Sequence, residues 1–326
     1  MPQLSIHYAA ARICMLRRDA MDKSRLARLQ SAGSLEEAKR ALGEIGWSAN
    51  DSDDWERLAE SRVQSAAETV MELTTDSQVT QAFLLKYDAT NLKTLIKARC
   101  LGLGPQRLNS CGTLPLDKLE HMCAAHSWKD LPLKHFREAM ETIEQQLLTK
   151  VDLLQIDLLI DRALYREIFQ RMNSRGGKQV KRYFQAKVDA VNAVSLLRAR
   201  RMQRDAAFYG KVLLEGGTIA SEAWLGAYDQ PERLPVLLAA YGDTVRTAAA
   251  DALADFSRLP ALECAMDNRM LKLLCTGPQE VFSEPYVLSY LLSAEREASA
   301  VRLIMAGKAN DFPQEAIEER LRELYV

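Results

Sequence analysis

The stretch YDATNLKTLIKAR, residues 87–99, spaces its apolar residues three and four positions apart, as on one face of an amphipathic helix. Two polar residues, Asp88 and Asn91, lie on the shoulder of this apolar stripe, and two bases, Lys97 and Arg99, lie at its end. Taken alone, the stretch predicts a helix and no function.

The pattern returns 101 residues later as VDAVNAVSLLRAR, residues 188–200. Asp189 and Asn192 take the two polar positions, and Arg198 and Arg200 take the two basic ones. Agreement of acid, amide, apolar pair, alanine and base indicates a repeated structural unit.

A third copy, REASAVRLIMAGK, occupies residues 296–308. Glu297 takes the acid position, Gly307 the small position and Lys308 the final base, whereas Ala300 replaces the amide. A spacing of about 100 residues is too long for tetratricopeptide or HEAT arrays, whose units run roughly 34 to 47 residues. Each predicted unit therefore holds several helices.

The segments that follow the first two copies also match, and the N-terminus has a similar one. Each contains a glycine and a hydroxyl residue, then an apolar residue and a new helix: CGTLPLDKLEHM (111–122), GGTIASEAWLGA (216–227) and AGSLEEAKRALG (32–43). We predict N-terminal helices forming a partial repeat and then three homologous helical modules. Their predicted bounds are 1–55 for the N-terminal helices and 56–150, 151–258 and 259–326 for the modules.

The whole chain is predicted to be all-α. Its 326 residues include only 15 glycines and 10 prolines, and helical spacing of apolar residues continues through most of the sequence. Ser34 and Glu37 form a capping box, in which each side chain binds an unpaired backbone N–H at a helix start. Asp311, followed by Pro313, predicts another helix start near the C-terminus.

The repeated polar positions have a structural interpretation and a functional one. Asp88 and Asn91 are predicted to hydrogen-bond each other or a neighbouring backbone group, because buried polar groups need partners. The bases either favour the negative end of a helix dipole or face a partner protein. We take five bases as the candidate interface: Lys97, Arg99, Arg198, Arg200 and Lys308.

The bulk composition narrows the class of protein. The formal net charge of −1 calls for no nucleic-acid partner. The six cysteines show no C-x-x-C spacing, which favours reduced thiols in a cytosolic protein. No signal peptide is visible, and no stretch is apolar enough to insert directly into a membrane.

Motifs for chemistry are weak, and no catalytic, cofactor-binding or metal site is predicted. The sequence has no phosphate-binding glycine loop of the Walker type, and Arg175–Lys178 (RGGK) is better explained as an inter-helix turn. His121, Cys123, His126 and His135 do not have the spacing of a zinc helix. The acid cluster from Asp51 to Asp54 resembles that of class II terpene cyclases, but it also suits a helix N-terminus.

Three segments resemble the C subunit of prokaryotic V-type (A-type) rotary ATPases, the counterpart of the eukaryotic d subunit. They are NLKTLIKAR (91–99), DRALY (161–165) and the C-terminal block EPYVLSYLLSAEREASAVRLIMAGKANDFPQEAIEERLREL (284–324). The match is weaker before about residue 80, and Ala300 departs from the family's asparagine.

The resemblance implies a funnel-shaped all-α protein with three similar domains about a pseudo-threefold axis. It implies a non-catalytic central-stalk subunit, a monomer within its complex, peripheral on the cytoplasmic face of the membrane. Its partners would be the central-shaft subunits and the membrane proteolipid ring, between which it transmits torque for proton or sodium translocation. Two alternatives remain: a generic helical protein-binding adaptor, and an all-α enzyme using Asp51 to Asp54.

Overall fold

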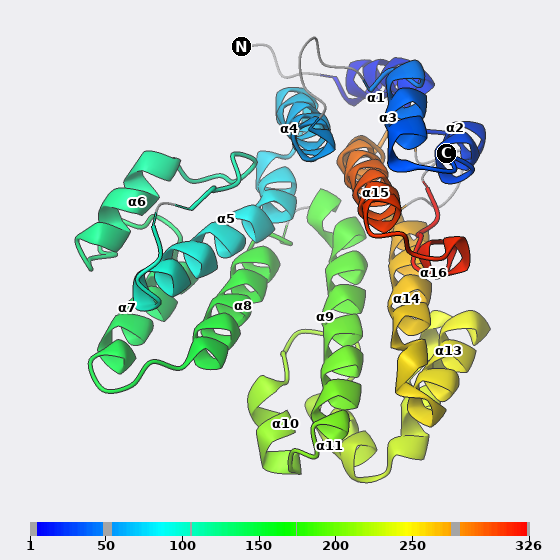
Figure 1. Cartoon of the computed structure of the whole chain (residues 1–326). Coiled ribbons are helices and arrows are strands. Elements are labelled where there is room, and N and C mark those ends of the chain that lie inside the picture. The colour runs from blue at the N-terminus through cyan, green and yellow to red at the C-terminus, as the bar shows by residue number, and fades with distance from the viewer. Residues whose placement is uncertain (1–4, 48–53, 105, 174, 275–280, 325–326) are drawn as a thin grey trace.

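The computed structural model describes residues 5–47, 54–104, 106–173, 175–274 and 281–324. Within these ranges the chain forms helices and turns and no strand, so the predicted all-α class is confirmed. Figure 1 shows two helical arms, α5–α8 and α9–α14, on one side of the N-terminal helices and α15.

The α-helices of the described ranges are α1 (Ile6–Leu16), α2 (Lys23–Gln30), α3 (Leu35–Glu44), α4 (Trp55–Leu73), α5 (Ser77–Cys100), α6 (Leu116–Ala124), α7 (Lys134–Leu147), α8 (Leu153–Gln170), α9 (Arg175–Arg201), α10 (Ala206–Val212), α11 (Ser221–Asp229), α12 (Leu234–Leu238), α13 (Asp243–Ala254), α14 (Leu259–Leu274), α15 (Glu284–Ala309) and α16 (Gln314–Glu318). Short 3-10 turns lie at Arg17–Asp19, Pro231–Arg233, Ala239–Tyr241 and Phe256–Arg258.

Three long helices, α5, α9 and α15, carry the three sequence copies and organise the fold. Near their N-terminal ends they meet at one repeat position, which is occupied by Phe83, Phe184 and Leu292. The rings of Phe83 and Phe184 lie 4.8 Å apart between centroids. From this centre α5 and α9 diverge beside α15 (Figure 1).

Each long helix packs along the helix that precedes another long helix. Helix α5 packs against α8, α9 packs against α14, and α15 packs against α4. The same relation therefore holds three times, and the third time it joins the C-terminal part of the chain to its N-terminal part. The N-terminal helices α1 and α3 also contact α15.

Buried apolar side chains form three clusters. The largest runs from α1 and α4 through the α5–α8 arm to α15, and a second fills the α9–α14 arm. The third joins α2 and α3 to the C-terminal half of α15 and to α16. Helices α2 and α3 thus cover the end of the C-terminal module.

The three long helices end in the same way. In each, the residue five positions past a repeated small residue donates its backbone N–H to that residue's carbonyl, as in a Schellman motif. The bonds are Leu103 N–H to Ala98 O (2.9 Å), Arg204 N–H to Ala199 O (3.0 Å) and Phe312 N–H to Gly307 O (2.9 Å). The residue before each donor has positive φ: Gly102 (64°), Gln203 (53°) and Asp311 (52°).

This ending corrects one prediction from the sequence. Asp311 does not cap a new helix; it takes the left-handed conformation that terminates α15. Helix α16 begins at Gln314 after Pro313, without a side-chain cap. The capping box at Ser34 is confirmed: Ser34 accepts from the Glu37 N–H, and Glu37 reaches back to the Gly33 N–H.

The predicted module boundaries fall close to helix starts, since α4 begins at Trp55, α8 at Leu153 and α14 at Leu259. No helix of the described residues is long and apolar enough to cross a membrane.

Candidate functional site

The acid of the first copy fastens the loop that follows α5. Asp88 is fully buried and accepts hydrogen bonds from the Thr113 N–H (2.9 Å), the Thr113 hydroxyl (2.7 Å) and the Leu114 N–H (3.0 Å). A Cβ placed on Gly112 would lie 2.3 Å from Asp88 Oδ1, so only glycine lets the loop approach the carboxylate. The Gly-Thr-Leu sequence is therefore the other half of the Asp88 motif.

The second copy repeats this arrangement in α9. Asp189 accepts from the backbone N–H groups of Thr218 (2.8 Å) and Ile219 (3.3 Å), and also from the Tyr241 hydroxyl (2.5 Å). A Cβ on Gly217 would lie 2.0 Å from Asp189 Oδ1. The repeated glycine is thus explained in both arms by one physical requirement, whereas the hydroxyl that binds the acid comes from Thr113 in the first arm and from Tyr241 in the second.

The repeated amide holds the same loop one turn further along each helix. Asn91 accepts from the Asn109 N–H (2.8 Å) and donates to the Asn109 carbonyl (2.9 Å). Asn192 makes the matching pair with the backbone of Leu214, at 2.9 Å in both directions. The prediction that the acid and the amide bind neighbouring backbone groups is confirmed.

The third copy uses its acid differently. Glu297 is 1% exposed and forms an ion pair with Arg62 of α4, whose Nε lies 3.0 Å from Oε2. Ser293 also donates to Glu297 (3.0 Å), and Arg62 donates to the Tyr290 hydroxyl (3.1 Å). The acid of α15 therefore joins the two ends of the chain instead of fastening a following loop.

Burial governs the ionisation of these acids. Burial raises the pKa of Asp88 and of Asp189, and the hydrogen bonds that each carboxylate accepts oppose the rise without cancelling it. Burial lowers the pKa of Arg62, but attraction and hydrogen bonds to Glu297 and Tyr290 together outweigh burial and raise it. The three acids therefore serve as structural anchors: Asp88 and Asp189 accept hydrogen bonds from loops, and Glu297 accepts them from Arg62 of α4 and from Ser293.

The candidate interface bases of α5 bind within the chain. Lys97 lies 2.6 Å from Asp157 of α8. Arg99 donates twice to Glu144 of α7 (2.8 Å each) and once to the Cys123 carbonyl (2.7 Å). Burial raises the pKa of Glu144, but hydrogen bonds from Trp128 and Arg99 overcome this and lower it.

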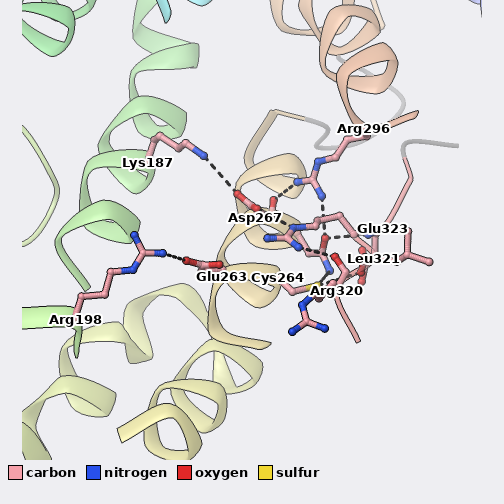
Figure 2. Close-up of polar contacts among 11 residues, drawn as sticks. Lys187, Arg198, Glu263, Cys264, Asp267, Arg296, Arg320, Leu321 and Glu323 are labelled. Carbon is pink, nitrogen blue, oxygen red and sulfur yellow. Dashed lines mark hydrogen bonds and ion pairs between the residues drawn. The ribbon is translucent and has the colours of Figure 1, made fainter. Parts of the chain in front are cut away.

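The bases of α9 have equivalent partners. Arg198 lies 2.9 Å from Glu263 of α14, a pair visible in Figure 2, and its side chain is still 60% exposed. Arg200 donates to the Tyr228 carbonyl (2.6 Å), as Arg99 does to that of Cys123. Lys308 of α15 has no side-chain partner within the residues that the structure describes.

A charged cluster around Asp267 joins several elements, and the sequence had not pointed to it. Figure 2 shows Lys187 of α9 and Arg296 of α15 converging on Asp267 of α14. Lys187 lies 3.5 Å from its carboxylate, Arg322 of the C-terminal segment lies 3.1 Å from it, and Arg296 donates to its carbonyl (2.7 Å). Burial raises the pKa of Asp267, but these three cations outweigh burial and lower it.

A repeat signal for this cluster was present. Asp267 aligns with Asp161 of α8, which pairs with Lys93 of α5 at 2.6 Å. Each of these acids thus binds a lysine of the long helix beside it. The Arg322 contact has no counterpart in the alignment, so no sequence pattern indicated it.

The weaker chemical candidates do not assemble into a site. Among the described residues no group of three or more His, Cys, Asp or Glu side chains could hold a metal ion. Asp54 caps α4 by accepting from the Glu56 and Arg57 N–H groups, while residues 51–53 lie outside the described ranges. The backbone of Arg175–Lys178 forms the first turn of α9, so the prediction of an inter-helix turn at these residues was wrong.

Comparison with known proteins decides the family. The model of the ATP synthase (C/AC39) subunit family matches residues 9–320. The chain belongs to this family. The match includes the N-terminal helices, where the resemblance in sequence had been weakest.

Several members of this family are similar to the chain over most of their length. The C subunit of the V-type sodium ATPase of Enterococcus hirae is 23% identical over 258 residues, covering 77% of this chain and 76% of that protein. The C subunit of the A-type ATP synthase of Haloferax volcanii is 25% identical over 252 residues, covering 73% and 72%. That of Pyrococcus abyssi is 22% identical over 253 residues, covering 75% and 68%.

Proposed function

We propose that this C/AC39 subunit is a non-catalytic central-stalk subunit of a rotary ATPase. In this role it would seat the central shaft, rest on the membrane proteolipid ring and transmit torque for ATP-linked proton or sodium translocation. The observation that carries the proposal is the family match over residues 9–320, together with relatives named as C subunits of V-type and A-type enzymes.

The internal bonding of the chain suits a part that carries torque. A coupler must resist bending, and closely packed helices have low compressibility. Ion pairs link the long helices to their neighbours: Lys97 to Asp157, Arg198 to Glu263 and Arg62 to Glu297. Because the α15–α4 pair joins the C-terminal module to the first module, load on the C-terminal module would pass directly to the first.

The proposal includes a pseudo-threefold arrangement of the modules at 56–150, 151–258 and 259–326. Its support is the packing relation that recurs in α5–α8, α9–α14 and α15–α4, together with the shared helix ending. A socket of three related units can surround a shaft. If the ring has a different symmetry, one set of specific contacts cannot repeat around it. Charged and water-mediated contacts then suit the ring face better than a deep apolar interface.

Among the five candidate interface bases, Lys308 is proposed as the strongest contact for the shaft or the ring. Lys97, Arg99, Arg198 and Arg200 are already engaged within the chain. The exposed guanidinium of Arg198 retains donors for a second partner. We place the protein as a monomer, peripheral on the cytoplasmic face, held through its partners.

The test is reconstitution with matched charge reversals. The tagged chain is expressed with and without the shaft and ring subunits of its own enzyme, and association is measured by pull-down and by sedimentation with membranes. We expect membrane association only when the ring is present, and weakening by Lys308→Glu but not by Lys118→Glu, which reverses an exposed lysine on α6. Capture of unrelated proteins with no shaft or ring would support the adaptor alternative and overturn the proposal.

A further inference from the structure

A cleft of about 550 Å³ lies between α8 and the turn that precedes α11. His135 of α7 and Arg162 and Arg166 of α8 line it, together with the rings of Tyr165 and Phe169. We call this the arginine cleft. Its lining residues come from both the α5–α8 arm and the α9–α14 arm, and it lies away from the cluster around Asp267.

The cleft is richer in cations than in acids. Glu215 is the acid among its lining residues, and no ion pair joins Glu215 to Arg166. Arg166 is exposed and its side chain has no partner within the described part of the chain, while Arg162 donates one hydrogen bond to the Lys211 carbonyl (2.5 Å). His135 Nδ1 makes no hydrogen bond and lies 3.6 Å from Glu138.

The turn at Gly216, which forms another wall of the cleft, packs closely against α8. Gly216 has φ of +99°, and a Cβ placed on it would lie 2.4 Å from Phe169 Cε2. The turn therefore lies directly on the edge of the Phe169 ring. Tyr165 and Phe169 of α8 also line the cleft, with ring centroids 6.4 Å apart and ring planes at 30°, so aromatic surface lies beside the arginines.

The repeat architecture does not require these bases. In the aligned helix α14 the positions of Arg162 and Arg166 are held by Asn268 and Lys272. There Lys272 pairs with Glu323 at the surface, and Asn268 binds the C-terminal segment. Of these two helices, α8 is therefore the one that carries two arginines beside aromatic residues.

We propose that the arginine cleft binds a soluble phosphate ester that carries a planar group, such as a nucleoside diphosphate. Arg162 and Arg166 are one helical turn apart and can present their forked donors to one phosphate group. The planar group would lie against Phe169, in a cleft whose volume is that of a small-molecule site. Side-chain donors would bind phosphate here without a Walker loop, and this binding goes beyond the proposed rotor role.

The test measures binding of ADP and of pyrophosphate to the full chain by titration calorimetry at low salt. We expect Arg166→Ala to weaken binding by about tenfold, since a charge-assisted hydrogen bond is worth roughly 1.5 kcal/mol or more. Arg162→Ala together with Arg166→Ala should abolish it. The control is Arg246→Ala, which removes an exposed arginine of α13 outside the cleft.

Three outcomes would overturn the proposal. They are no binding of either probe at millimolar concentration, equal weakening by the control variant, and binding of anionic phosphatidylserine vesicles with no binding of the soluble probes. Tighter binding of ADP than of pyrophosphate, lost in Phe169→Ala, would support the assigned place of the planar group. If the double variant fails to fold by circular dichroism, Arg166→Ala alone decides, because that side chain is exposed and has no partner within the described residues.

Discussion

Alanine in place of Gly112 is predicted to destabilise the α5–α8 arm, although the change adds only one methyl group. The new Cβ would lie 2.3 Å from Asp88 Oδ1 and 3.5 Å from the Asp88 backbone nitrogen. Asp88 is fully buried, so its carboxylate cannot swing into solvent to make room. The loop must move, and the hydrogen bonds from Thr113 and Leu114 must lengthen or break.

The expected cost follows from these bonds. A hydrogen bond to a charged acceptor contributes roughly 1.5–3 kcal/mol, and a buried acceptor left without donors costs a similar amount. Loss of one or two of the three bonds to Asp88 therefore predicts a decrease of about 2–4 kcal/mol in the free energy of unfolding. Gly217→Ala should have an effect of similar size, because its Cβ would lie 2.0 Å from Asp189 Oδ1.

Urea unfolding followed by far-ultraviolet circular dichroism measures this change, with Gly43→Ala as the matched control. Gly43 lies in α3 with nothing within 4 Å of an added Cβ, so the same substitution there should stabilise by about 0.5–1 kcal/mol. In the double variant Asp88→Ala with Gly112→Ala, the costs should be less than additive, since the clash is gone. A cost below about 0.5 kcal/mol for Gly112→Ala would refute the reasoning.

Three further predictions test other anchors. Arg62→Ala should lower the free energy of unfolding by about 3–5 kcal/mol, because it leaves the buried Glu297 carboxylate unpaired; an effect within 1 kcal/mol would show that water or relaxation replaces the ion pair. The lowered pKa of Asp267 stabilises the fold above its unfolded pKa, and this contribution is lost as the pH falls through the folded pKa. Asp267→Asn should therefore flatten the acid limb of a stability profile measured below about pH 4, and an unchanged limb would contradict the assignment. Arg99→Ala should destabilise the isolated chain, whereas Lys308→Glu should leave its melting curve unchanged; the reverse order in a thermal scan would overturn their assigned roles.

The sequence predicted those features that depend on local pattern or on repetition. Helical periodicity indicated the all-α fold, and alignment of residues 87–99 with 188–200 identified two helices that the structure places in equivalent surroundings. It also predicted that Asp88 and Asn91 bind backbone groups, since a buried polar residue requires a partner. The glycine and threonine after the first two copies were visible as a pattern, but only the distance from Gly112 to Asp88 explains the glycine.

Contacts between distant segments could not be predicted from one sequence. The Arg62–Glu297 pair joins residues 235 positions apart, and nothing in either neighbourhood specifies the other. The same holds for Arg322 and Asp267, which lie 55 positions apart. The prediction for Asp311 was wrong for another reason: an acid before a proline fits a helix start, but Asp311 lies four residues past Gly307, at the repeat position where α5 and α9 also end.

The partners of the repeated bases explain why the third copy differs. Arg99 and Arg200 each donate to a carbonyl of a later helix in the same arm, at Cys123 in α6 and Tyr228 in α11. In the described residues after α15, the short α16 follows, and Lys308 finds no such carbonyl there. For Lys308 the helix dipole at the end of α15 is the structural explanation that is left, and no hydrogen-bond partner adds to it within the described residues. Its charge is available to a neighbour, which is why Lys308, and neither Arg99 nor Arg200, is the residue on which the interface proposal depends.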